Sequence, residues 1–210
     1  MEEKVEKISF TSNSDFLYMS FHAREEAKNW NKISKLALDC NIIIQASVLS
    51  VYASELYLKS LLMLLGVDAL NECKGNNGHK LLSLFRKIPD MKLKSSIANN
   101  VIYRCNDLQK KFDDEEQMVS YFEKQIEKIS TAYEQYRYLY EKFLRKTPIS
   151  IPLDLVFNLC YILGKECDLI EYEKVDENGN ITDTPDVKYR YYIVGKGWVD
   201  ELENTGKNNN

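Results

Sequence analysis

The stretch from Cys40 to Gly66, CNIIIQASVLSVYASELYLKSLLMLLG, constrains the fold more than any other part of the chain. No charged residue lies between Cys40 and Ser54, and only Glu55 and Lys59 interrupt the apolar character before Gly66. A helix of this length is about 40 Å long and apolar on nearly every face, so it must be enclosed by other helices. Gly66 is a natural stop, because a helix often ends in a left-handed residue. The sequence therefore predicts a buried central helix.

The composition is that of an ordinary globular protein, with 44% hydrophobic and 29% charged residues in a chain of 210. The net charge of −4 argues against a chain-wide attraction to nucleic acid or anionic lipid. The uncharged run is shorter than the roughly 20 residues of a membrane span, and the N-terminus, MEEKVEK, does not resemble a secretory signal. The five cysteines contain no C-x-x-C pair. We therefore expect no membrane contact and a cytoplasmic location, where thiols stay reduced.

Helical periodicity continues on both sides of the central run. The spacing of apolar residues predicts further helices over residues 12–38, 80–87, 91–112, 115–146 and 153–169. The first of these is amphipathic, with charges such as Arg24 and Lys28 between its apolar positions. We expect it to lie against the central helix.

The character of the chain changes after Glu171. Segments 170–175 and 187–194 contain β-branched and aromatic residues, and Asn178-Gly179 between them is a hairpin signal. The expected fold is all-α, an up-and-down helical bundle over residues 12–146. A C-terminal helix and a small β-hairpin follow over residues 147–200, and a disordered tail over 201–210.

Two sets of polar residues in the first half of the chain are candidates for a functional site. Glu55 and Lys59 lie four apart on one helical face, where an ion pair that fixes helix register is the plainer interpretation. His79 follows a glycine-rich loop and precedes a helix, so it can cap that helix or enter a site.

The third candidate lies on the late helix, in AYEQYRYLYEKF. Arg137, Tyr138 and Glu141 share a face with Glu134. An aromatic-rich packing helix with an Arg–Glu pair is the common case. A nucleic-acid interpretation would use Arg137 for phosphate and the tyrosines for base stacking.

Other motifs with known chemistry are missing from the sequence. There is no P-loop and no dinucleotide-binding glycine pattern. The sequence has no H-E-x-x-H or G-x-S-x-G motif, and its two histidines and scattered cysteines have no zinc-ligand spacing. We therefore expect no cofactor and no bound metal.

Taken together and in this order, three segments resemble a HEPN domain: Ala53–Gly66, Gly78–Phe85 and Tyr136–Glu141. The resemblance covers roughly residues 15–145. It implies a bundle of four or five helices, often assembled as a dimer. HEPN proteins occur in prokaryotic toxin–antitoxin, abortive-infection and other defence settings. Many are metal-independent ribonucleases, and some bind nucleotides.

The chain departs from the ribonuclease branch of that family. That branch carries an arginine followed four to six residues later by a histidine, whereas neither His22 nor His79 has such an arginine upstream. What matches is a set of polar residues expected to form one ligand-binding cluster: Glu55, Lys59, His79, Arg137, Tyr138 and Glu141.

Three hypotheses follow from this pattern. The first is a non-catalytic module, forming a homodimer, that binds a nucleotide, RNA or a cognate protein partner. The second is a divergent metal-independent ribonuclease with His79 as general acid or base and Arg137 stabilising the phosphorane. The third is a structural polar cluster with no ligand. The missing motif makes the first our expectation, and an enzyme the less favoured one.

Overall fold

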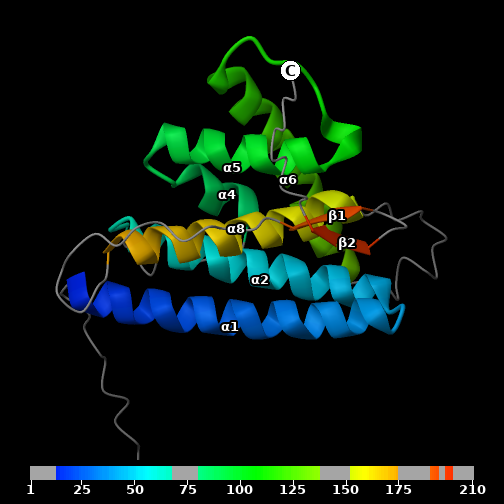
Figure 1. The fold of residues 1–210 in the computed structure, drawn as a ribbon, viewed down its shortest axis with the longest axis horizontal. Helices are drawn as coiled ribbons and strands as arrows, with labels where there is room; N and C mark the ends of the chain where they lie inside the picture. Colours follow the sequence, from blue (N-terminus) through cyan, green and yellow to red (C-terminus); the bar gives the residue numbers. More distant parts are fainter. Residues whose placement is uncertain (1–12, 68–79, 138–151, 175–189, 194–196, 201–210) are drawn as a thin grey trace, which may run out of the picture.

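The computed structural model of the chain describes residues 13–67, 80–137, 152–174, 190–193 and 197–200. Within these residues the chain is predominantly helical, as predicted (Figure 1). The helices are α1 (Asn13–Asp39), α2 (Ile43–Leu64), α4 (Leu81–Arg86), α5 (Met91–Arg104), α6 (Glu115–Arg137) and α8 (Leu153–Lys174), with a short 3₁₀ helix at Asn106–Leu108. Strands β1 (Arg190–Ile193) and β2 (Gly197–Asp200) pair antiparallel.

The predicted central helix is confirmed as α2. It packs against α1 and α8 and also contacts α4 and α6, whereas α5 packs against α8 and α6 (Figure 1). Leu58, Leu61 and Leu62 are completely buried. By length and composition α2 alone among the described helices could cross a membrane, but 72% of its most apolar window is buried inside the bundle. That burial is typical of the core helix of a soluble protein.

Small residues join α1 and α2 closely. They recur every seven positions on both helices: Ser20, Ala27 and Ser34 on α1, and Ala46, Ala53 and Ser60 on α2. All six are buried. The Ser20 and Ser60 hydroxyls lie 2.8 Å apart, and the Ser34 hydroxyl donates to the Ala46 carbonyl at 2.7 Å. These contacts fix the two helices as an antiparallel hairpin, with Ala27 and Ala53 midway along the seam.

A residue with left-handed backbone conformation follows the C-terminus of each of these two helices. After α1, Asn41 has φ 59°, and the Ile42 amide donates to the Ala37 carbonyl at 2.8 Å. After α2, Gly66 has φ 77° and the Val67 amide donates back into the last turn. The stop predicted at Gly66 is confirmed, and both ends have the hydrogen bonds of a Schellman motif.

Helix α8 belongs to the same hydrophobic core as α2. Its buried residues include Leu159, Ile162 and Leu163. A Cβ added to Gly164 would lie 3.0 Å from the buried Tyr57 ring, so the absence of a side chain there lets α8 approach α2. Described residues from both sides of the boundary that the sequence suggested at residue 147 therefore share one hydrophobic core.

Two predicted boundaries differ from the structure. The strand expected at 170–175 is helical to residue 174, because Ile170 packs against the core and the glutamates and lysine that follow favour helix. The strand that pairs with Arg190–Ile193 lies after it, at Gly197–Asp200. The helix expected over 91–112 ends at Arg104, where Cys105 adopts an extended conformation.

Candidate functional site

Of the six residues predicted to form a ligand-binding cluster, the structure describes the side chains of Glu55 and Lys59. His79, Tyr138 and Glu141 lie outside the described residues. Arg137 is the last described residue of α6, and its side chain is not described. Convergence of the whole cluster therefore stays a prediction.

Glu55 and Lys59 form an ion pair on α2. The Lys59 ammonium donates to Glu55 Oε1 at 2.6 Å, a charge-assisted hydrogen bond. The Glu55 side chain is 7% exposed and the Lys59 side chain 23%. A carboxylate in a helical core needs such a partner, because burying an unpaired charge is costly. The pair thus provides one cation at the edge of the core, which fits either a register-fixing role or one wall of a ligand site.

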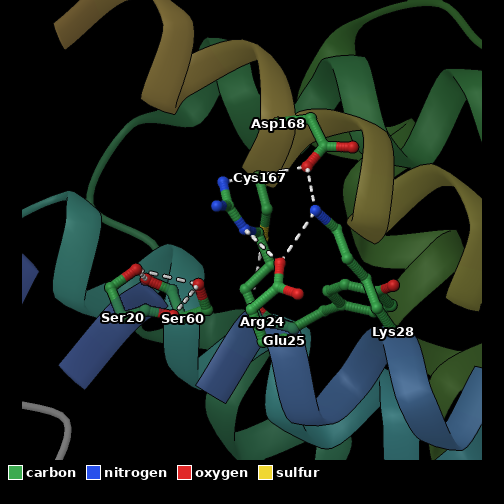
Figure 2. A network of polar contacts seen from close by, with 8 residues as sticks. Ser20, Arg24, Glu25, Lys28, Ser60, Cys167 and Asp168 are labelled. Atoms are coloured by element: carbon green, nitrogen blue, oxygen red, sulfur yellow. Dashed lines mark hydrogen bonds and ion pairs between the residues drawn. The ribbon is translucent and has the colours of Figure 1, made fainter. Parts of the chain in front are cut away.

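A second polar network, which the sequence did not indicate, joins α1 to α8 (Figure 2). Arg24 was expected on the polar face of α1, yet it is only 5% exposed. Its Nη1 lies 3.7 Å from Asp168 Oδ1, and the Lys28 ammonium lies 3.3 Å from the same oxygen. Glu25 accepts from Lys28 at 3.1 Å. Two cations from α1 therefore share one carboxylate from α8.

Beneath this network, Cys167 and Tyr57 lie in the core. The Cys167 thiol donates to the Tyr57 carbonyl at 3.3 Å. Burial raises the pKa of Cys167 to about 12, and it also raises the pKa of the Tyr57 hydroxyl. Both groups are therefore un-ionised at neutral pH and supply no nucleophile or base. The network of Arg24, Lys28 and Asp168 holds two helices together and has no visible chemistry of its own.

Large apolar side chains are exposed at one end of the α1–α2 hairpin. We call this set the hairpin tip: Ile33, Leu36, Ile42, Ile43 and Ile44. Their exposed fractions run from 38% to 64%. The sequence pattern assigned these isoleucines to buried helix faces, which is wrong. Phe157 of α8 packs on Ala46, and Ile42 to Ile44 precede that contact in the chain, at the start of α2. Several large apolar side chains exposed near one end of a hairpin are typical of an interaction site.

Comparisons with protein-family models, with curated proteins and with solved structures find no match for this chain. Among the described residues, no group of three or more histidine, cysteine or acidic side chains is arranged to hold a metal ion.

Proposed function

We propose that this chain is a non-catalytic, HEPN-like binding module that acts through contacts between proteins. The observation that carries the proposal is the hairpin tip, five large apolar side chains exposed together at one end of a well-packed bundle. The three HEPN-like segments and the missing Arg-to-His motif support the same reading. A cytoplasmic prokaryotic defence or toxin–antitoxin setting is part of the proposal.

The first partner we propose is a second copy of the chain. Helix α1 forms one edge of the described bundle, where the elements that pack on it are α2 and α8, and its outer face points away from both (Figure 1). On that face Glu26 and Lys32 are both exposed, on either side of the exposed Asn29. Two α1 helices that lie antiparallel about Asn29 bring Glu26 of each copy opposite Lys32 of the other. Such an isologous contact repeats each favourable pair twice.

The apolar residues of α1 fit the same arrangement. Phe21 and Leu36 are exposed near opposite ends of the face. Antiparallel pairing about Asn29 brings Phe21 of one copy to Leu36 of the other. The hairpin tip then receives the first turns of the second copy's α1. Apolar contact supplies affinity in this arrangement, and the two charge pairs set the orientation.

Charge exchange tests this geometry. Sedimentation of the purified chain should show a monomer–dimer equilibrium. Either Glu26→Lys or Lys32→Glu should weaken the dimer about tenfold, because each places like charges together twice. The double variant should recover the parent's affinity. Lys92→Glu, an exposed charge change on α5, is the matched control and should have no effect. A monomeric parent, or single variants that dimerise like the parent, would contradict the proposed interface.

A further inference from the structure

A groove of about 390 Å³ lies where α5 ends and the chain turns toward α6. Its apolar part consists of the buried Ile102 and the rings of Tyr103 and Phe112. Tyr103 is 64% exposed, and the half-buried Phe112 ring is held 5.3 Å from the Tyr121 ring. An exposed tyrosine beside a fixed aromatic ring offers a flat surface on which a planar ligand can stack.

The polar part of the groove carries positive charge and amide groups. Lys110 and Lys111 are both exposed, and the Lys110 ammonium lies 5.7 Å from the centroid of Tyr121. Gln109 Nε2 donates to the Tyr103 carbonyl at 2.9 Å, which ties the turn to the end of α5. The exposed Asn99 amide completes the rim. Cations beside aromatic rings suit a ligand that is both flat and negatively charged.

The neighbouring charges limit how large that ligand can be. The acidic run Asp113 to Glu116 follows the lysines directly. The Asp114 carboxylate is held in place because it accepts a hydrogen bond from the backbone N–H of Gln117 at 2.7 Å and so caps α6. An extended polyanion would meet these carboxylates, whereas a compact ligand with one anionic group can reach the lysines alone. The groove volume is also at the lower end of the range for small-molecule sites.

We propose that this groove binds a small planar aromatic anion. The ring stacks on Tyr103 and contacts Phe112, and the anionic group lies against Lys111 and Lys110. The site is on the α5 side of the bundle and is independent of the α1 face of the proposed dimer. Loss of ligand binding and loss of dimerisation can therefore be told apart by measuring both on each variant.

Two kinds of ligand share this chemistry, so two probes are needed. The full chain is titrated by calorimetry with adenosine monophosphate and, separately, with indole-3-carboxylate. Saturable one-site binding of at least one probe is expected, and the probe that binds identifies a nucleoside phosphate or an aryl carboxylate as the source. Adenosine and inorganic phosphate, each alone, should bind about tenfold more weakly, because each has only half of the required chemistry.

Variants of two exposed lining residues, Tyr103 and Lys111, test the geometry. Tyr103→Leu should weaken binding about tenfold through lost stacking. Lys111→Gln should weaken it several-fold, and that effect should shrink in high salt. Both side chains are exposed, so circular dichroism should show folded variants. Lys92→Gln, on α5 outside the groove lining, is the matched control. No saturation by either probe at about 5 mM, or binding that both lining variants leave intact, would overturn the proposal.

Discussion

Replacement of Leu58 by alanine tests whether α2 is the centre on which the bundle depends. The Leu58 side chain is completely buried and belongs to the main core cluster. Truncation removes three carbons, worth about 2.4 kcal/mol at roughly 0.8 kcal/mol per buried carbon group. The cavity left behind adds to this, so the free energy of unfolding should fall by about 3–5 kcal/mol. For a chain of this size, that is a loss of roughly 6–20 °C in melting temperature.

Urea denaturation followed by circular dichroism measures this loss, with Leu36→Ala as the matched control. Leu36 is 64% exposed, so the same truncation should cost less than about 0.5 kcal/mol. Leu36 lies on the proposed dimer face, and the control is therefore run at two protein concentrations. The Leu58 effect should not depend on concentration. Equal losses for the two variants at low concentration would refute the placement of α2 at the centre.

Three further outcomes follow from the titratable groups and the missing motif. Burial raises the pKa of the Glu166 carboxyl above its ordinary value of 4.5, and a hydrogen bond from Ser96 offsets only part of this rise. The folded state therefore binds that proton more tightly, and stability should fall as pH rises above about 4.5. Glu166→Gln should remove this loss, measured as urea midpoints from pH 4 to 8. Native alkylation located by mass spectrometry should modify the exposed Cys40 at pH 8, because burial raises the pKa of three other thiols to about 12. These are Cys105, Cys160 and Cys167. The purified chain should cleave no RNA in chelator; cleavage that His79→Ala and Arg137→Ala both abolish would establish the divergent ribonuclease instead.

The fold was predictable where hydrophobicity alone decides the structure. An uncharged run that ends at Gly66 has few alternatives to a buried helix, and α2 follows that prediction closely. The prediction of a strand at 170–175 is wrong, because Ile170 and its neighbours fit a strand pattern locally but extend α8 along the core. Local propensity does not reveal such tertiary contacts.

The polar groups were harder to predict. Arg24 fits the solvent face of an amphipathic helix by spacing, but Asp168 from a distant part of the chain allows its burial. Likewise, the uncharged apolar run that contains Ile42 to Ile44 predicts that these three residues are buried. Their exposure depends on which part of α2 lies against α8, which no local pattern encodes. The Glu55–Lys59 pair, in contrast, could be inferred directly, because its four-residue spacing is a property of the helix itself.

One long-range feature was nevertheless readable from the sequence, namely the seven-residue recurrence of small residues on both α1 and α2. Such spacing lets two antiparallel helices approach closely, and Ala27, which is completely buried, lies at the middle of the seam. Ala27→Leu should therefore destabilise the chain by about 1–3 kcal/mol through overpacking, although leucine is nearly as good a helix former as alanine. Ser120→Leu, at an exposed position of α6, is the matched control and should change stability by less than about 0.5 kcal/mol. If Ala27→Leu unfolds at the parent's urea midpoint, the two helices are not in close contact at this position, and the seam does not set the pairing of the hairpin.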